Sequence, residues 1–159
     1  LTAAHTGLRM GEILSLRWKD IEFKERRILI EKTKNNERRM VPINDTLHGV
    51  LKSLPVHLGT DLVFPGITRN QLSVAFRRAS KRAGIRDFRF HDLRHTFASY
   101  LTMGGENPRT VQILLGHKDL RMTMRYSHLS PEHLREAVSI LDKSLNSISN
   151  GHYSGTGEK

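Results

Sequence analysis

The sequence predicts an α+β fold that is mostly helical, with one small three-stranded antiparallel sheet near the amino terminus. Apolar residues recur at helical spacing in most of the chain, for example at Leu93, Phe97, Ala98 and Leu101. Strand-like segments are confined to residues 21–43. The 159 residues have the length of one ordinary domain, and 37% hydrophobic residues suffice for a core.

The first third of the chain is predicted to hold a broken helix followed by the sheet. Residues 1–17 read as helix with an interruption near Thr6-Gly7, because glycine often ends a helix. Asn35-Asn36 is expected to form a tight turn between the last two strands. Pro42 places the third strand at an edge, since proline cannot donate to an inner ladder. The expected strands span residues 21–23, 27–32 and 38–43.

The middle of the chain is predicted to hold two amphipathic helices. Asp45 is expected to cap the first of them, and Pro55 ends or kinks it. Its apolar face comprises Leu47, Val50, Leu51 and Leu54. A short extended or looped piece follows at residues 61–66. The second helix, residues 69–83, is strongly basic, and Gly84 is its natural stop.

The last part of the chain is predicted to be helical, ending in a polar tail. Gly104-Gly105 ends one helix, Asn107-Pro108 begins the next, and Gly116 ends that one. Residues 1–145 are expected to form one domain and residues 146–159 a disordered, Gly/Ser-rich tail. The expected helices span residues 91–103, 108–115, 119–126 and 131–145.

Charge and composition narrow the classes of partner. Lys and Arg total 26 against 16 acidic residues, which gives a net charge of +10 and attracts polyanions. The basic residues lie within segments that are predicted to fold, which indicates a shaped binding surface. No run of 18 apolar residues exists, so no membrane span is expected. The absence of cysteine fits an intracellular, cytoplasmic protein.

Polar residues concentrate at the ends of predicted elements. Three potential cations and one acid, His91, Asp92, Arg94 and His95, share the first turns of a core helix, which indicates a nearby anion. Arginine suits phosphate because its planar fork donates paired hydrogen bonds. A tyrosine hydroxyl beside such a group can act as a nucleophile. The other polar residues at such junctions are Arg9, Lys34, His117 and Tyr126.

Five short motifs in order resemble those of the tyrosine recombinases, the phage integrase family. TGLRMGEIL at residues 6–14 resembles the first arginine box, and HDLRH at residues 91–95 resembles the H-x-x-R box. The hairpin at residues 32–36, followed by Val41-Pro42, resembles the element that carries the catalytic lysine. The remaining matches are LGH at residues 115–117 and YSH at residues 126–128. The resemblance covers about residues 1–145 and implies the integrase-type catalytic-domain fold.

The resemblance implies DNA strand cleavage and rejoining through a 3′-phosphotyrosyl intermediate, as in site-specific recombination and integration. It implies Tyr126 as the nucleophile and Lys34 as the acid for the leaving 5′-oxygen. It implies that His91 moves the tyrosine proton and that Glu12 orients its neighbours. No cofactor or metal is needed, because the phosphotyrosine bond keeps the phosphodiester energy. Contacts to the non-bridging phosphate oxygens are implied for Arg9, Arg94 and His117.

Double-stranded DNA is the implied partner, and the full-length protein would act as a homo-tetramer on paired DNA sites. The basic helix is expected to contact the DNA backbone through Arg77, Arg78, Lys81 and Arg82. The chain begins at Leu1 within a helical pattern, so we expect an N-terminally truncated protein that lacks the family's core-binding domain. The final helix packs either on its own domain or on a neighbouring protomer.

Several assignments leave an alternative open. Lys32 points to the same side of a strand as Lys34, although the interval to Val41-Pro42 favours Lys34. Tyr100 is expected to have a core role and Tyr153 lies in the predicted tail, so Tyr126 is the tyrosine with the matching flank. His95 is expected to be a structural histidine with a satisfied hydrogen bond. The i, i+4 spacing of His91 and His95 does not indicate zinc, since no HExxH pattern or cysteine accompanies it.

Three other functions fit part of the pattern. A non-catalytic DNA-binding module, such as a helix-turn-helix regulator, explains the charge but not the positions of Lys34, His117 and Tyr126. A type IB topoisomerase-like relative would share the phosphotyrosine chemistry. An inactive relative would lack this chemistry. The presence of all six expected catalytic residues argues against that alternative; they are Arg9, Lys34, His91, Arg94, His117 and Tyr126.

Overall fold

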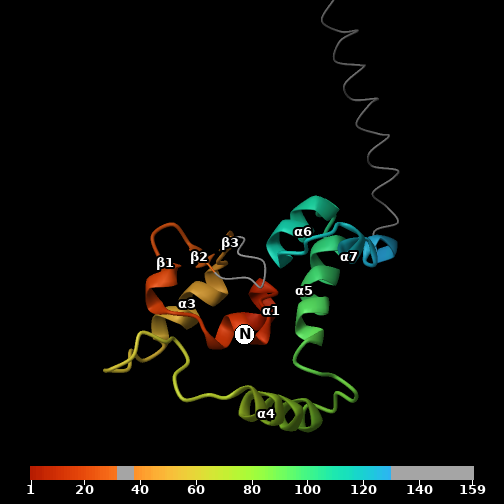
Figure 1. Cartoon of the computed structure of the whole chain (residues 1–159). Helices are drawn as coiled ribbons and strands as arrows, with labels where there is room; N and C mark the ends of the chain where they lie inside the picture. The colour runs from red at the N-terminus through yellow and green to blue at the C-terminus, as the bar shows by residue number, and fades with distance from the viewer. Residues whose placement is uncertain (32–37, 130–159) are drawn as a thin grey trace, which may run out of the picture.

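The structure is a computed structural model that describes residues 1–31 and 38–129 (Figure 1). It confirms the predicted fold class, because the described chain is mostly helical and contains one small three-stranded antiparallel sheet. The sheet and α3 lie on one side of the molecule, and α5, α6 and α7 on the other, with α1 between them (Figure 1). None of the helices in residues 1–31 and 38–129 has the length and apolarity to cross a membrane.

Two short helices at the amino terminus meet at Gly7, as predicted. α1 spans Thr2–Thr6 and α2 spans Met10–Leu14, with a 3-10 turn at Trp18–Asp20 after them. Gly7 has φ 64°, a left-handed conformation that L-residues rarely adopt. A Cβ atom there would lie 2.6 Å from the Phe97 ring and 2.8 Å from Leu115. The glycine therefore lets the chain leave α1 in close contact with α5 and α6.

The sheet follows the predicted strands. β1 spans Ile21–Glu22, β2 spans Arg27–Ile30 and β3 spans Arg39–Pro42, in the order β1-β2-β3. Both pairings are antiparallel, and Ile28 of β2 lies opposite Val41 of β3. β3 lies at an edge of the sheet, which confirms the prediction made from Pro42. The expected turn at Asn35-Asn36 lies outside the described residues.

Helix α3 spans Asp45–Ser53, and its cap differs from the prediction. Asn44, not Asp45, is the N-cap, because Asn44 has an extended backbone and its side chain accepts a hydrogen bond from the Leu47 N–H. Asp45 already lies in the first helical turn, where its charge complements the helix dipole. The helix ends before Pro55, since Leu54 adopts the extended conformation that a following proline requires.

Four helices make up the rest of the described fold. α4 spans Arg69–Arg82, α5 Asp92–Met103, α6 Pro108–Leu115 and α7 Arg121–Met124, with a 3-10 turn, η2, at Ser127–Leu129. Asn107 caps α6 with its side chain and Gly116 ends it with φ 63°, both as predicted. The predicted helix at residues 131–145 and the predicted tail lie outside the described residues.

The core has two parts that meet along the α1–α5 contact. The larger part packs α1, α2, the sheet and α3 around fully buried side chains such as Leu47 and Ile28. The smaller part joins α5, α6 and the segment after α7 through Ala98, Val111, Leu115 and Tyr126.

The structure corrects the expected core role of Tyr100, whose side chain is 71% exposed. The buried stripe of α5 runs through Arg94, Ala98 and Thr102. Tyr100 stands about 200° around the helix from Ala98, at 100° a residue, and therefore faces solvent.

Candidate active site

Arg94 projects from the start of α5 into the protein and is only 4% exposed. One guanidinium nitrogen donates to the Gly7 carbonyl at 2.6 Å, and another donates to the Leu115 carbonyl. These carbonyls are free because Gly7 ends α1 and Leu115 is the last residue of α6. Burial, followed by the charge of Arg9, lowers the pKa of Arg94 to about 10, so the side chain remains cationic at neutral pH.

Arg9 also reaches this end of α6. It is the N-cap of α2, and its backbone N–H donates to the Glu12 carboxylate at 2.8 Å. Its guanidinium donates to Glu12 at 3.2 Å and to the Gly116 carbonyl at 3.3 Å. The Arg9 side chain is 40% exposed, so it remains accessible to a ligand. Arg9 and Arg94 therefore meet at residues 115–116 although 85 positions separate them in the sequence.

Arg39 was not singled out from the sequence, yet it completes this arrangement. Its guanidinium donates to both carboxylate oxygens of Glu12, at 3.0 and 2.8 Å. The Arg39 side chain is 7% exposed and that of Glu12 is 9% exposed. The available signal was the alternation of β3, which places Arg39 on the same face of the strand as buried Val41. Gly116 makes room for this ion pair, because a Cβ atom there would lie 2.7 Å from Arg39.

Loss of the Glu12 carboxylate is expected to destabilise the fold. In Glu12→Ala the Arg39 cation stays buried without its partner, which should lower the free energy of unfolding by about 3 kcal/mol. Urea denaturation followed by circular dichroism measures the change. Glu106→Gln, at an exposed position, serves as the control. A Glu12→Ala change as small as that of the control would contradict a structural role for this pair.

The same pair is expected to make stability sensitive to acid. Burial opposes ionisation of Glu12, but hydrogen bonds from Arg39 and Arg9 and their charges outweigh it and lower the pKa below its ordinary value. A carboxylate with a lowered pKa contributes stability that is present above the unfolded pKa of about 4.3 and is lost as the pH falls through the folded pKa. As the pH falls through this range, the urea midpoint of the wild type should approach that of Glu12→Gln, because Glu12 becomes neutral.

His117 follows Gly116 and lies beside the two arginines. Its Nδ1 is 2.9 Å from the hydroxyl of Thr123 in α7, and its carbonyl accepts from the Gln112 side chain at 3.0 Å. Burial, then the positive charges of nearby arginines and of His95, lowers the pKa of His117 to about 4. The imidazole is therefore neutral at pH 7 and offers a hydrogen bond rather than a charge.

We expect the folded chain to keep His117 neutral well below pH 6. The unfolded histidine titrates near pH 6.5 and the folded one at about 4, so the unfolded chain binds more protons between these values. The contribution of His117 to stability should therefore rise with pH across this window. Proton NMR of the imidazole C–H signals measures the titration, with exposed His57 as the internal control. A His117 midpoint near 6.5 would refute this environment.

Tyr126 follows α7 and packs against α5, with only 6% of the residue exposed. Its hydroxyl lies 2.6 Å from Nδ1 of His95. Burial raises the pKa of the Tyr126 phenol above its ordinary value, although the charges of Arg125 and Arg94 oppose the shift. His91, the exposed N-cap of α5, places its ring edge against His95 at a centroid distance of 5.1 Å. Burial, then the charges of His95 and Arg94, lowers the pKa of His91.

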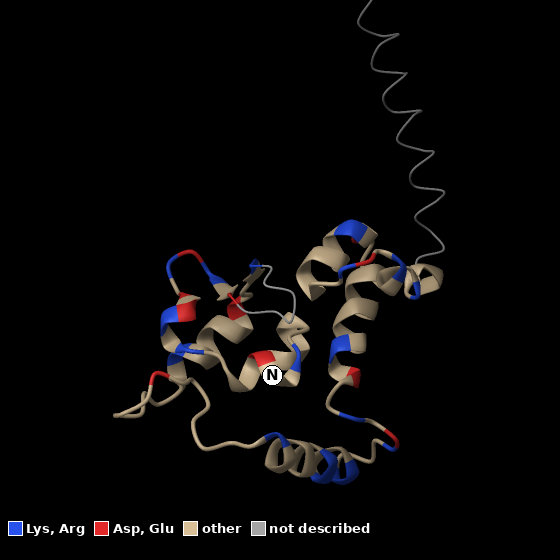
Figure 2. Cartoon of the chain, in the orientation of Figure 1, with Lys and Arg blue, Asp and Glu red and all other residues tan. Residues whose placement is uncertain are grey.

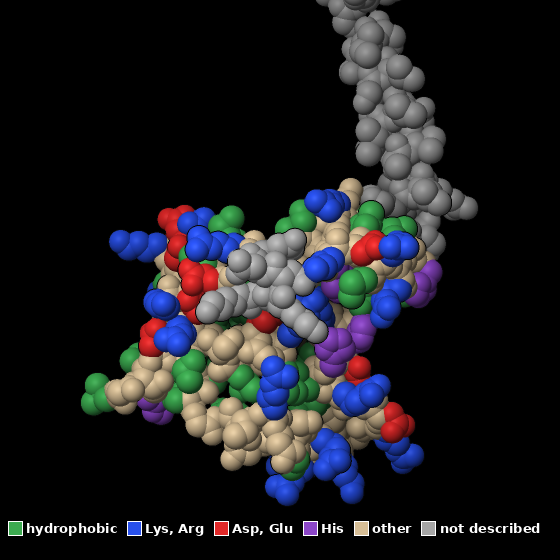
Figure 3. All heavy atoms as spheres, viewed as in Figure 1, with side chains coloured by type: hydrophobic (Ala, Val, Ile, Leu, Met, Phe, Trp, Pro, Cys, Tyr) green, Lys and Arg blue, Asp and Glu red, His purple; other side chains and the backbone are tan. Residues whose placement is uncertain are grey.

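Most of the predicted site residues thus lie on connected elements. Arg9, Glu12, Arg94 and His117 gather at the carboxyl end of α6, and Tyr126 lies on the neighbouring face of α5. Histidine side chains gather there on one face of the molecule, with Lys and Arg side chains around them (Figure 3). The predicted Lys34, like its alternative Lys32, lies outside the described residues.

His95 is the residue whose surroundings the sequence did not predict. The expected hydrogen bond is present, but it joins His95 to the hydroxyl of the candidate nucleophile. The available signal was its position one turn after His91 on the same helix face.

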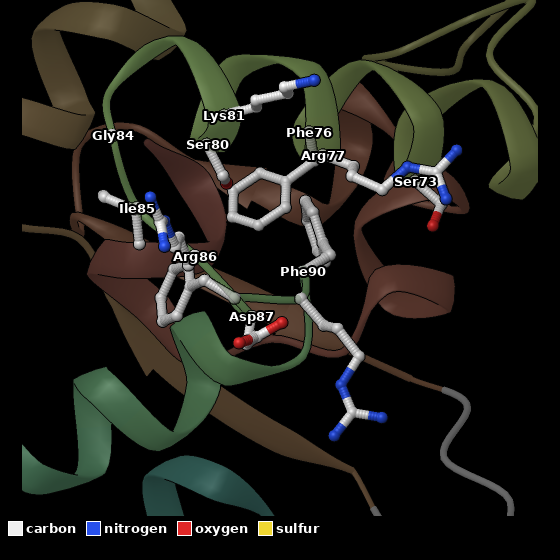
Figure 4. A pocket seen from close by; sticks show the side chains of 12 residues that line it. Ser73, Phe76, Arg77, Ser80, Lys81, Gly84, Ile85, Arg86, Asp87 and Phe90 are labelled. Atoms are coloured by element: carbon white, nitrogen blue, oxygen red, sulfur yellow. The ribbon is translucent and has the colours of Figure 1, made fainter.

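The basic helix α4 carries all four expected DNA-contacting residues in exposed positions, and Figure 2 shows Lys and Arg along its carboxyl-terminal half. Arg77 and Lys81 line a groove of about 1020 Å³ together with Arg86 and Arg89 (Figure 4). In this groove the Phe76 ring packs against the rings of both Phe88 and Phe90.

The four expected residues of α4 do not all line this groove. Arg82 lines a different, mainly apolar pocket between α4 and the amino-terminal helices, beside Leu72 and Ile13. The structure therefore brings Arg77 and Lys81, rather than the whole set, to one groove.

Residues 1–133 match the phage integrase family, and the chain belongs to this family. It is 37% identical over 157 residues to the integrase of Salmonella phage P22, a match that covers 88% of this chain and 41% of that protein. The family assignment agrees with the motifs at residues 6–14, 91–95, 115–117 and 126–128.

Solved structures share the fold. The catalytic domain of bacteriophage HP1 integrase superposes with a TM-score of 0.68 at 33% identity, covering 87% of this chain and 77% of that one. The XerH site-specific recombinase bound to its difH substrate gives a TM-score of 0.72 at 30% identity, covering 88% of this chain and 44% of that one. The chain spans less than half the length of the first curated relatives that it matches.

Proposed function

We propose that this chain performs DNA strand cleavage and rejoining for site-specific recombination, through a 3′-phosphotyrosyl bond at Tyr126. The observation that carries the proposal is the meeting of Arg9, Arg94 and His117 at one helix end, with Tyr126 bound to the helix that bears Arg94. Two cations and a neutral imidazole at one place suit a phosphate whose charge grows in the transition state. The family membership of the chain supports the same reaction.

The proposed reaction begins when the Tyr126 oxygen attacks the phosphorus of a DNA phosphodiester. The bond to the 5′-oxygen breaks, and Lys34 supplies the proton that this oxygen takes as it leaves. Arg9 and Arg94 donate to the non-bridging oxygens, and His117 donates there as a neutral group. A partner strand's 5′-hydroxyl then attacks the phosphotyrosine and restores a phosphodiester. The energy of the bond is kept, so the scheme requires neither ATP nor a metal.

Glu12 acts in this scheme by positioning. It joins Arg9 to buried Arg39, which fixes the Arg9 backbone at the start of α2 and limits where its side chain lies. In our proposal residues 1–145 are the catalytic domain. Because this chain spans less than half of its longer relatives, we propose that a longer form of it carries a further, core-binding domain.

Duplex DNA is the proposed partner. We propose that the full-length protein binds paired DNA sites as a homo-tetramer. The net charge of +10 and the basic groove beside α4 support backbone contacts by Arg77 and Lys81. Arg78 and Arg82 are exposed on the same helix and are proposed as further contacts. The XerH structure, which is of a recombinase bound to its difH substrate, supports DNA as the ligand class.

Covalent trapping tests the proposal. The chain, and in parallel any longer natural form of it, is incubated with nicked duplexes of randomised sequence, so that cleavage releases a short strand and prevents rejoining. SDS-resistant adducts are isolated, their DNA is sequenced and the attached peptide is identified by mass spectrometry. The three tyrosines, Tyr100, Tyr126 and Tyr153, fall in three different tryptic peptides.

Attachment to the peptide that carries Tyr126 would support the proposal. Attachment elsewhere would move the nucleophile. Sequence-selective binding by the longer form without any adduct would indicate a DNA-binding module. Adducts that form equally on all sequences, together with relaxation of supercoiled DNA, would indicate topoisomerase activity.

A further inference from the structure

The hydroxyl of Tyr126 contacts a residue to which the proposed reaction has given no role. Within the part of the chain that the structure describes, its side-chain hydrogen-bond partner is His95, at 2.6 Å. The two rings lie 6.0 Å apart and are tilted by 49°, so the imidazole edge meets the phenol oxygen. His91, the expected proton carrier, touches His95 rather than the tyrosine in this arrangement.

The chemistry of the contact favours proton transfer. A buried phenol holds its proton more tightly than one in water, so it reacts slowly unless an acceptor lies within hydrogen-bond distance. A neutral imidazole is such an acceptor near neutral pH. When the phenol donates to Nδ1, the hydrogen of the neutral ring is on Nε2. Packing fixes the pair, because Tyr126 is held by Ala98, Val111 and Leu115 in the smaller core.

We propose that His95 is a catalytic residue, the base that accepts the Tyr126 proton during cleavage and returns it during rejoining. The inference rests on the proposed function, since it concerns the same nucleophile. As the Tyr126 oxygen bonds to phosphorus, its proton moves to Nδ1 of His95. The 5′-oxygen leaves with a proton from a separate acid, and the reverse transfers restore the phenol. The incoming phosphate is the negative group that favours the imidazolium form of His95.

Several titratable and charged groups surround His95. His91 and Arg94 lie on its own helix, and His117 and Arg125 belong to the segments that pack beside Tyr126. His5 in α1 and His128 in η2 belong to elements packed against α5, and Arg9 lies at the end of α6. A pH profile of the wild type alone therefore reports several groups, and variants must separate them.

A DNA-free measurement tests the contact itself. Carbon-13 at the phenolic carbon of tyrosine distinguishes Tyr126 from exposed Tyr100 by its resonance. We expect His95→Ala to move the Tyr126 titration and resonance, and His57→Ala, at an exposed loop position, to leave both unchanged. An unchanged Tyr126 signal in a folded His95→Ala chain would overturn the proposal.

Single-turnover cleavage of the nicked duplex recovered by trapping tests the role. We expect His95→Ala to slow cleavage by about 100-fold or more and to shift the rising limb of the pH profile upward. Added imidazole should restore part of the rate. His95→Gln keeps much of the side-chain size and a hydrogen-bonding group but cannot act as a base, so it should be equally slow. His57→Ala should match the wild type.

The rival outcome is that His91 is the base. Cleavage by His95→Gln at the wild-type rate, with the pH profile altered in His91→Ala instead, would overturn the proposal for His95 and leave Tyr126 as the nucleophile. Failure of the wild-type longer form to give any adduct would remove the proposed function, and the inference with it. The two failures are thus distinguished by whether the wild-type adduct forms.

Discussion

Replacing Tyr126 with phenylalanine is expected to abolish covalent attachment to DNA while the fold and the DNA affinity persist. The change removes only the hydroxyl, so the ring still fills the space between α5 and α6. The lost hydrogen bond to His95 should cost about 1 kcal/mol of unfolding free energy. No other atom of the side chain can attack phosphorus, so adduct formation should fall below detection.

The adduct is measured on denaturing gels and DNA binding by fluorescence anisotropy, both with the trapped sequence. Tyr100→Phe is the matched control, because Tyr100 loses the same atom at a position that is 71% exposed. An adduct that survives in Tyr126→Phe, or that vanishes in Tyr100→Phe, would refute the assignment of the nucleophile.

Replacing Arg94 with alanine is expected to impair both stability and cleavage. Its guanidinium joins the end of α1 to the end of α6 through two carbonyls, Gly7 and Leu115, which the smaller side chain would leave without this donor. Because these hydrogen bonds are charge-assisted, we expect their loss to lower the free energy of unfolding by about 3 kcal/mol. The loss of one donor to the transition-state phosphate should also slow cleavage by at least about 100-fold.

Arg94→Lys separates the two effects. Lysine keeps the positive charge but donates from one nitrogen, so it cannot reproduce the fork that reaches both carbonyls. We expect partial recovery of stability and little recovery of cleavage. Urea denaturation and single-turnover cleavage measure the two quantities, with exposed Lys52→Ala as the control. Wild-type cleavage by a folded Arg94→Ala chain would contradict a role at the phosphate.

The sequence predicted the elements because their boundaries depend on local chemistry. Gly7 and Gly116 both adopt left-handed conformations at helix ends, and Asn107-Pro108 begins α6 with a side-chain cap. Pro42 lies on an edge strand for the reason that predicted it. The cap of α3 was wrong by one residue, because Asn44 and Asp45 both have suitable side chains and only the backbone path selects between them.

Motif spacing also determined the family and the candidate residues, but not their contacts. Arg9, Arg94, His117 and Tyr126 were identified by the residues that flank them. Their convergence required the packing of α1 and α6 on α5, which brings together backbone that is remote in the chain. Figure 1 shows α1 beside α5, with α6 near one end of α5.

By itself, the sequence determined the fold class, the order and approximate bounds of the elements, the basic character of the chain and its family. These follow from side-chain periodicity, backbone preference and short motifs, all of which act over a few residues. Tertiary structure alone decided that Arg39 holds Glu12, that Tyr100 faces solvent and that His95 meets Tyr126. The Arg39–Glu12 and His95–Tyr126 contacts join residues 27 and 31 positions apart, and the exposure of Tyr100 depends on which helix face the core covers. Tertiary packing determines both.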